Sequence, residues 1–300
     1  MKKVIVTGGA GFIGSHIVDA LVDLGYEVHI VDNMSSGNPE NVNPKATLHT
    51  VDIRDGAKLS LLFAGATYVF HEAASLQVQY SMENPVETND INVNGLLNVL
   101  EASRINKVKR VIFASSCAVY GDQATLPLVE SMEPAPLSPY GAQKYMGEVY
   151  MKLYSQIYGL ETVCLRYFNV YGKRQSVSGA YPSVVALFVD LLKNGKPLTV
   201  TGDGKQTRSF VNVLDIAKAN ILAMEGENIG KGEIINIATN EQSSINEIAR
   251  LVGGEVVFIP PRVEPRAASG DIHKAKELLG WEPSIELSEG IIELKKYNNI

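Results

Sequence analysis

Three side chains of this sequence have types and spacing that suit acid–base chemistry at a hydroxyl group: Ser116, Tyr140 and Lys144. A phenol has a pKa of about 10, too high for a base at neutral pH. Lys144 lies four residues after Tyr140 in a helical pattern, so we expect its ammonium to favour the phenolate. Ser116 follows a buried strand and is expected to guide the proton. By itself, a Tyr-x-x-x-Lys pair usually belongs to a solvated helix face, so this reading depends on the elements around it.

The start of the chain is typical of a dinucleotide-binding strand, turn and helix. An apolar run at residues 4–6 meets Gly8, Gly11 and Gly14, and a helical pattern follows. These glycines suit a tight turn, a close backbone approach to a pyrophosphate, and a helix packed on its strand. Asp32 ends the second strand, where a carboxylate accepts hydrogen bonds from ribose and repels a 2′-phosphate. This favours NAD over NADP, the alternative being that Asp32 is an ordinary turn residue.

Strand and helix patterns alternate along the first half of the chain. We expect strands near 4–6, 27–31, 48–51, 67–71, 110–114 and 161–166, and helices over about 57–64, 85–106 and 140–156. This alternation predicts an α/β fold with a doubly wound parallel sheet of Rossmann type. Ligands bind such sheets at the carboxyl ends of the strands.

The second half is less regular and predicts a smaller, interleaved α/β substrate lobe. We assign residues 1–172 to the nucleotide-binding domain, and a helix and strand at about 213–240 return to its sheet. Residues of about 173–212 and 241–300 would form the smaller lobe.

Composition limits the partners. The formal net charge of −6 and pI of about 5.5 leave no basic face for nucleic acid or anionic lipid. Two cysteines, Cys117 and Cys164, fit a reduced cytoplasmic protein, and no Cys/His spacing suggests a metal. No apolar run approaches the length of a membrane span, so we expect no membrane association.

Taken together, the motifs resemble the extended short-chain dehydrogenase/reductases, and within them the UDP-glucose (UDP-galactose) 4-epimerases. The resemblance rests on residues 7–14, Ser115 to Gly121, Tyr140 to Lys144 and Arg166 to Asn169, and continues from Gly202 to Trp281. It implies an isomerase in which the Tyr140 phenolate takes the proton of the sugar 4′-hydroxyl while a hydride passes from C4′ to NAD⁺. The 4-keto sugar then turns over and receives the hydride on its other face.

The resemblance also implies the site residues. Cofactor positions are Gly8, Gly11, Phe12, Ile13, Gly14, Asp32, Asn33, Met34, Ser35, Ser36, Gly37, Asp52, Ile53, Ala73, Ala74, Asn92, Ser115, Tyr140, Lys144 and Phe168. Catalytic positions are Ser116, Tyr140 and Lys144, and substrate positions are Ser116, Asn169, Thr199, Arg208, Arg262, Arg266 and Ala268. Arg208 suits a diphosphate, and either Arg262 or Arg266 completes the phosphate grip. Ala268 is small where a bulky residue would exclude an N-acetyl group, so UDP-GlcNAc and UDP-GalNAc are expected substrates as well.

Two other functions stay open. A 4-ketoreductase or decarboxylase acting on another nucleotide sugar would use the same scaffold, but such decarboxylases and dehydratases usually carry an acid after the catalytic Ser/Thr. Here Cys117 and Ala118 follow Ser116. A non-catalytic NAD-binding scaffold is the third reading, and the intact Ser116, Tyr140 and Lys144 argue against it. Apolar faces at about 86–104 and 140–156 predict a homodimer, although they could also pack within one chain.

Overall fold

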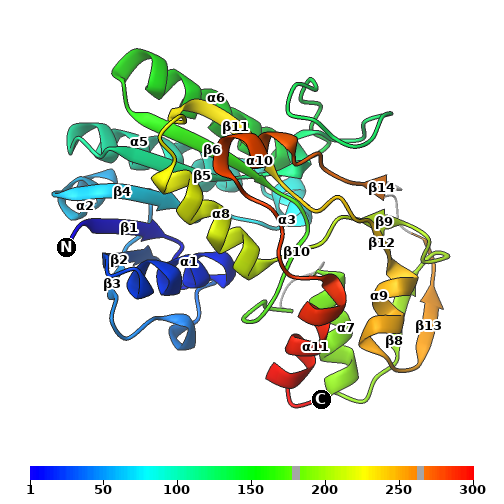
Figure 1. The fold of residues 1–300 in the computed structure, drawn as a ribbon. Helices are drawn as coiled ribbons and strands as arrows, with labels where there is room; N and C mark the ends of the chain where they lie inside the picture. Colours follow the sequence, from blue (N-terminus) through cyan, green and yellow to red (C-terminus); the bar gives the residue numbers. More distant parts are fainter. Residues whose placement is uncertain (178–182, 262–266) are drawn as a thin grey trace.

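A seven-stranded parallel sheet lies at the centre of the computed structural model, which describes residues 1–177, 183–261 and 267–300 (Figure 1). Its order is β11-β6-β5-β4-β1-β2-β3. The strands are β1 (Lys3–Thr7), β2 (Glu27–Asp32), β3 (Thr47–Thr50), β4 (Ala66–His71), β5 (Arg110–Ser116), β6 (Glu161–Tyr167) and β11 (Lys231–Ile237). The strand order reverses between β1 and β4, where open α/β sheets bind ligands. The predicted doubly wound parallel sheet is confirmed.

Helices cover both faces of this sheet, and each face has its own apolar core (Figure 1). One face is covered by α1 (Phe12–Asp23), α8 (Val213–Glu225) and α10 (His273–Leu279), and the other by α2 (Gly56–Leu62), α5 (Gly95–Ile105) and α6 (Pro139–Tyr158). Because parallel strands are buried on both faces, they form nearly continuous apolar runs. Val4, Ile5 and Val6 of β1 are fully buried in this way.

The segment predicted as one helix over 85–106 has three parts. It consists of α4 (Pro85–Asn89), a π-helical turn (Asp90–Asn94) and α5. It follows α3 (Val78–Glu83), which packs against α6. The apolar periodicity continues through the π turn, which explains why the sequence did not reveal the interruption.

The smaller lobe has a third core, built from helices and short strands around Phe188, Val200 and Ile248. Its elements are α7 (Val184–Lys193), β8 (Leu198–Thr201), β9 (Thr207–Arg208), β12 (Ser243–Ser244), α9 (Ile245–Val252), β13 (Val256–Ile259), β14 (Ala267–Ala268) and α11 (Leu287–Tyr297). A short parallel pair, β7 (Val170–Tyr171) with β10 (Val211–Asn212), lies where the chain leaves the main sheet.

The proposed assignment of residues to two domains stays a prediction, but two contacts bear on it. β11 joins β6 at the edge of the main sheet, as expected for the returning segment. In contrast, α10 and Trp281, which the sequence analysis places in the smaller lobe, pack into the core beneath the sheet. The Trp281 indole donates to the Asp215 carbonyl of α8 at 2.9 Å.

Candidate active site

The N-terminus of α6 fixes the position of Tyr140. Ser138 caps the helix, because its hydroxyl accepts a hydrogen bond from the Gly141 amide at 3.2 Å, and Pro139 occupies the first helical position. The Tyr140 amide donates to the Ser81 hydroxyl of α3 at 3.1 Å. The predicted cap is therefore present, and α3 adds a second anchor that local sequence does not show.

The structure brings the three predicted catalytic side chains together. Tyr140 and Lys144 are buried on one face of α6, and the Tyr140 phenol is hydrogen-bonded to Ser116 at the end of β5. The Lys144 ammonium donates to the Ala114 carbonyl at 2.7 Å and lies 5.8 Å from the centre of the Tyr140 ring. It also lies 4.9 Å from the centre of the Phe113 ring.

The pKa of Tyr140 is not lowered as the sequence led us to expect. Burial raises the pKa of Tyr140 to about 12, and of its neighbours it is Ser116 that lowers this pKa, through the hydrogen bond. Burial also lowers the pKa of Lys144 to about 8. The expected attraction between ammonium and phenolate is outweighed by the cost of removing both charged groups from water.

The glycine-rich turn between β1 and α1 is packed so closely that a side chain at Gly8 or Gly14 would clash with the backbone. A Cβ at Gly14 would lie 2.2 Å from the Gly8 carbonyl oxygen. Gly8 has a φ of +72° and its Cβ would lie 2.7 Å from the Ala73 amide nitrogen, so the turn lies directly against the loop after β4. Ala73 therefore lies beside the glycine-rich turn at the carboxyl edge of the sheet, and its contact with a cofactor stays a prediction.

Asp32 lies at the end of β2 with its carboxylate against the glycine-rich turn. One oxygen accepts from the Ala10 amide at 3.0 Å and the other from the Met34 amide at 2.9 Å. A carboxylate has about four acceptor sites, so Asp32 keeps capacity for two ribose hydroxyls. The glycine-rich turn and the Asp32 carboxylate both fit a bound dinucleotide.

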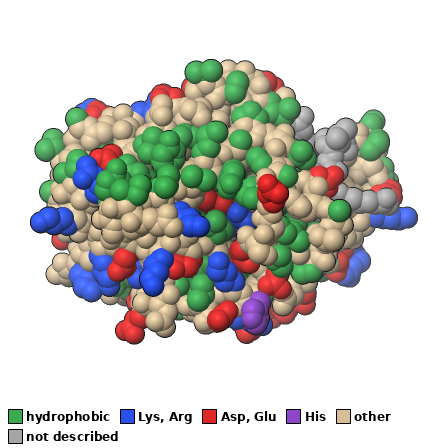
Figure 2. Space-filling view, turned by 90° about the horizontal axis from the view of Figure 1, so that it is seen from above, with side chains coloured by type: hydrophobic (Ala, Val, Ile, Leu, Met, Phe, Trp, Pro, Cys, Tyr) green, Lys and Arg blue, Asp and Glu red, His purple; other side chains and the backbone are tan. Residues whose placement is uncertain are grey.

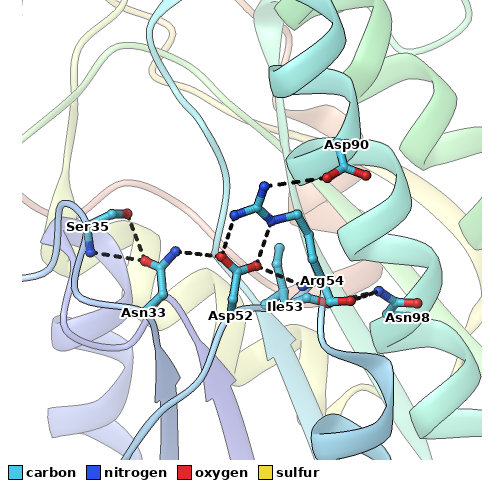
Figure 3. A network of polar contacts seen from close by, with 7 residues as sticks. All are labelled: Asn33, Ser35, Asp52, Ile53, Arg54, Asp90 and Asn98. Carbon is cyan, nitrogen blue, oxygen red and sulfur yellow. Dashed lines mark hydrogen bonds and ion pairs between the residues drawn. The ribbon is translucent and has the colours of Figure 1, made fainter.

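A polar network joins the loops after β2 and β3 (Figure 3). The Asp52 carboxylate accepts from Asn33 at 3.0 Å and from two Arg54 nitrogens at 3.0 and 2.8 Å. The Asn33 side-chain oxygen in turn accepts from the Ser35 hydroxyl at 2.7 Å. Hydrogen bonds from Arg54 hold the pKa of Asp52 well below its usual range. The network keeps three predicted cofactor residues, Asn33, Ser35 and Asp52, at one edge of the sheet.

The side chains of two other predicted cofactor residues, Ser115 and Asn92, form hydrogen bonds to other residues of the chain. The Ser115 hydroxyl donates to Glu148 at 2.6 Å. The Asn92 amide lies in the π turn, accepts from the Ser75 amide at 2.7 Å and donates to Gln143 at 2.7 Å. Asn92 therefore fixes the loop that carries Ala73 and Ala74, and its contact with a cofactor stays a prediction.

The predicted substrate residues lie on both lobes. Asn169 donates to the Ser209 carbonyl at 3.0 Å, next to Arg208 on β9. β9 pairs with β14, where Ala268 lies opposite Arg208. Cys117 directly follows the catalytic Ser116 and lies near the substrate positions as well. Burial raises the pKa of its thiol, and the Asn169 backbone and the Arg208 charge act in the opposite direction.

The remaining predicted positions are more scattered. Thr199 lies on β8, paired with Val257 of β13, and Arg262 and Arg266 lie outside the described residues. Phe168 is fully buried after β6, with its ring against Gly270, where a Cβ would lie 2.6 Å from it. The predicted contact of Phe168 with a nicotinamide stays a prediction.

Sequence reasoning missed two buried carboxyl groups beside the catalytic residues. Glu148 on α6 forms an ion pair with Arg166 of β6 at 2.7 Å, with both side chains 1% exposed. Glu72 follows β4 and accepts from the Tyr167 hydroxyl at 3.0 Å. For Glu72 the available signal was a charged residue directly after a buried strand, at the edge where ligands bind. Glu148 lies within α6, where its sequence neighbours give no comparable signal.

Residues 4–238 match the model of the NAD dependent epimerase/dehydratase family. This chain belongs to the NAD-dependent epimerase/dehydratase family. The family spans the Gly8 turn, the Asp32 edge and the Ser116, Tyr140 and Lys144 group in a single match.

Full-length relatives support the membership. A Methanocaldococcus jannaschii protein, provisionally named a UDP-glucose 4-epimerase, is 44% identical and covers 99% of both chains. A UDP-glucose 4-epimerase of Thermotoga maritima, solved with UDP-glucose, is 39% identical with a TM-score of 0.93, over 99% of this chain and 100% of that one. A UDP-N-acetylglucosamine 4-epimerase of Methanobrevibacter ruminantium, solved with UDP-N-acetylmuramic acid, is 38% identical with a TM-score of 0.94, over 99% and 97%.

These findings confirm three predictions for this member of the epimerase/dehydratase family: the family resemblance, an enzyme of the isomerase class, and NAD as cofactor. Over residues 1–177, 183–261 and 267–300, no group of three or more His, Cys, Asp or Glu side chains could hold a metal ion. Among the helices in that part of the chain, none has the length and apolar character needed to cross a membrane.

Proposed function

We propose that this chain is an NAD-dependent UDP-sugar 4-epimerase that interconverts UDP-glucose and UDP-galactose and also accepts UDP-GlcNAc and UDP-GalNAc. The observation that carries the proposal is the buried Ser116, Tyr140 and Lys144 group at the carboxyl edge of the sheet. Cys117 and Ala118 follow Ser116 in the sequence, so the acidic residue that an elimination needs is missing at this position. Relatives of similar length are named UDP-glucose 4-epimerases.

Each side chain of the site has its own role in the proposed epimerisation. Tyr140 exchanges a proton with the sugar 4′-hydroxyl, and Ser116 bridges the phenol and that hydroxyl. Lys144, fixed on the Ala114 carbonyl, places a positive charge behind the phenol. Gly8, Gly14 and Asp32 hold the dinucleotide, which supplies a hydride acceptor and a positively charged ring when bound. Asn169 and Arg208 hold the nucleotide part, leaving the sugar free to turn between the two transfers.

The decisive experiment incubates the purified protein with UDP-galactose and no added NAD. We expect UDP-glucose to appear by chromatography, since the hydride returns to the sugar and the cofactor is not consumed. Release of CO₂ from a UDP-uronic acid, or net oxidation of NADH, would instead indicate the decarboxylase or ketoreductase. Tight NAD binding without turnover of any of the four sugars would indicate a scaffold.

Ala268→Tyr should separate the two sugar classes. Ala268 lies opposite Arg208 on the β9–β14 pair, so a phenol ring there would narrow the space beside the substrate positions. We expect the kcat/KM for UDP-GalNAc to fall at least about tenfold relative to that for UDP-Gal, as an excluded acetamide group requires. Ala268→Ser is the control and should leave the ratio unchanged. An unaltered ratio in Ala268→Tyr would show that Ala268 does not line the sugar pocket.

We infer that two copies of this chain pair through α6 and its neighbour α5. Met146, Val149, Leu153 and Ile157 form one apolar stripe on α6 and are each at least 38% exposed. Figure 2 shows hydrophobic side chains gathered across this side of the molecule, where α6 lies uppermost in Figure 1. Such a stripe on a long helix is typical of helix pairing about a twofold axis.

Sedimentation should therefore give twice the chain mass of 32.6 kDa. Leu153→Glu places a charge in the stripe and should yield monomers. Leu24→Glu is the matched control, since Leu24 is 54% exposed directly after α1, which covers the opposite face of the sheet from α6, and this variant should stay dimeric. A monomeric wild-type protein at micromolar concentration would exclude the pairing.

A further inference from the structure

A row of polar contacts runs from the loop after β2, across the loop after β3, to the π turn (Figure 3). Asn33 donates to Asp52 at 3.0 Å, and Arg54 binds Asp52 through two side-chain nitrogens at 3.0 and 2.8 Å. The other terminal nitrogen of Arg54 contacts the Asp90 carboxylate at 3.5 Å. We call Asn33, Asp52, Arg54 and Asp90 the edge network. It joins three segments that are separate in the sequence.

The Asp52 carboxylate fixes the Arg54 guanidinium in one orientation. Besides the three side-chain bonds, Asp52 accepts from the Arg54 backbone amide at 2.9 Å. A carboxylate has about four acceptor sites, and four donors occupy them here. The bonds from Arg54 hold the pKa of Asp52 well below its usual range. The pair therefore stays charged at neutral pH.

The backbone beneath Arg54 is held by α5. The Asn98 amide donates to the carbonyls of Ile53 and Arg54 at 3.1 and 3.0 Å. Ile53 is 5% exposed, and a Cβ at Gly95 would lie 2.5 Å from its side chain. The loop after β3 is therefore fixed on the first turn of α5, whereas the Arg54 side chain above it is 41% exposed.

The weakest contact of the edge network is the one that crosses to the π turn. Arg54 binds Asp52 through two bonds but reaches Asp90 through one contact of 3.5 Å, which is long for a hydrogen bond. The Asp90 side chain is 47% exposed, and its other oxygen accepts from Asn94 at 2.9 Å. Rotation of two exposed side chains is enough to break the contact while both backbones stay in place. The network can therefore open between Arg54 and Asp90.

The order of the strands places the adenosine half of a dinucleotide beside this network. The pyrophosphate belongs at the glycine-rich turn after β1, and Asp32 at the end of β2 keeps acceptor sites for the ribose. β3 is the next strand, about 4.8 Å further out. We therefore expect the base, which follows the ribose, to reach the end of β3, where residues 51–54 leave the sheet.

We propose that Arg54 is a cofactor-retaining residue: fixed on Asp52 and in contact with Asp90, it closes the outer side of the adenosine site, and NAD leaves when the Arg54–Asp90 contact opens. The inference rests on the NAD site of the proposed function and is independent of the sugar. A guanidinium is planar, keeps its charge and binds two carboxylates at once. An epimerase returns the hydride to the sugar in every cycle, so slow release of NAD suits the reaction.

The release rate of NAD tests this role without any sugar. Protein loaded with NAD labelled in the adenine ring is mixed with excess unlabelled NAD, and the label that stays bound is followed over time. Arg54→Gln should release the label about three- to tenfold faster than the wild type, since it loses charge-assisted bonds to both carboxylates. Release at the wild-type rate would overturn the proposal.

Arg104→Gln is the matched control for this measurement. The Arg104–Glu101 pair has a similar length of 2.7 Å, and its side chains are 39% and 41% exposed. It lies in the last two turns of α5, away from the first turn, on which the loop after β3 packs. The release rate of NAD should therefore match the wild type. Faster release in this variant as well would show that the effect is not specific to the edge network.

Asp90→Asn isolates the contact that is proposed to open. It removes the charge facing Arg54, leaves the bonds between Arg54 and Asp52 in place, and should speed release about twofold. When Arg54→Gln is already present, Asp90→Asn should add nothing further, because both changes act through one contact. Fully additive effects would contradict the proposed opening. The single Asp90→Asn variant also carries the test should Arg54→Gln fold poorly.

The two halves of the cofactor separate retention of adenosine from a general loosening of the fold. AMP contains the adenosine, and NMN lacks it. In protein stripped of NAD, Arg54→Gln should raise the Kd for AMP about as much as it speeds NAD release, while the Kd for NMN and the Tm stay at wild-type values. Equal weakening of NMN and AMP binding would refute the inference. None of these measurements requires turnover, so their failure is distinguishable from failure of the proposed epimerisation.

Discussion

Tyr140→Phe should lower the kcat for UDP-sugar interconversion by about 10²- to 10⁴-fold, the usual contribution of a positioned proton-transfer group. The substitution removes only the hydroxyl that is hydrogen-bonded to Ser116. The ring is buried at the start of α6, and its backbone anchor, the bond to Ser81, does not involve the side chain. Fold and cofactor retention should therefore persist while turnover is lost.

The measurement compares turnover of UDP-Gal with the NAD content and circular dichroism of the same preparation. Tyr145→Phe is the matched control, because Tyr145 lies next along the helix and is 37% exposed, outside the buried catalytic group. It should retain wild-type activity. If Tyr140→Phe kept more than about a tenth of the wild-type kcat, the proton would have to travel through another group, and the proposed roles of Ser116 and Lys144 would fail with it.

Glu148→Gln should reduce the free energy of unfolding by about 3–5 kcal/mol, because it leaves the Arg166 guanidinium buried without a counter-charge. Glu148 and Arg166 are each 1% exposed and share two hydrogen bonds, of 2.8 and 2.7 Å. Ser115 adds a third bond to Glu148 at 2.6 Å. The pair joins α6 to β6, so its loss weakens the support of the helix that carries Tyr140.

Urea unfolding followed by fluorescence measures this loss. Glu282→Gln serves as comparison, since its pair with Lys276 at 3.0 Å has side chains 63% and 41% exposed. An exposed pair contributes less than about 1 kcal/mol. Equal effects of the two substitutions would show that burial of the Glu148–Arg166 pair has no special weight in this fold.

Much of the architecture could be predicted because its signals are local. The apolar run of β1, the glycines that follow it, and the Ser138–Pro139 cap each specify their structure through nearby residues. The order of the sheet follows from the alternation of strand and helix. These same local signals placed Ser116, Tyr140 and Lys144 at one edge of the sheet, where the structure has them.

What could not be predicted depends on contacts between distant segments. Burial of Tyr140 involves α3, and burial of Glu72 involves β6 and α8, so neither pKa can be inferred from the neighbouring sequence. The π turn at Asp90–Asn94 leaves the apolar pattern intact. Helix α10 joins the main core through Ala275 and Leu279, although its sequence position suggests the smaller lobe.

The position of Arg208 has a consequence for how tightly a diphosphate could be held. Its strand, β9, is bonded to β12 on one side and to β14 on the other, so the arginine stands in the middle of a miniature sheet. A backbone fixed in this way loses little freedom when a ligand arrives, and affinity rises because less ordering remains to be done. A nucleotide bound at Arg208 would meet a rigid anchor, while its hexose, beyond that anchor, keeps the rotational freedom that inversion at one carbon demands.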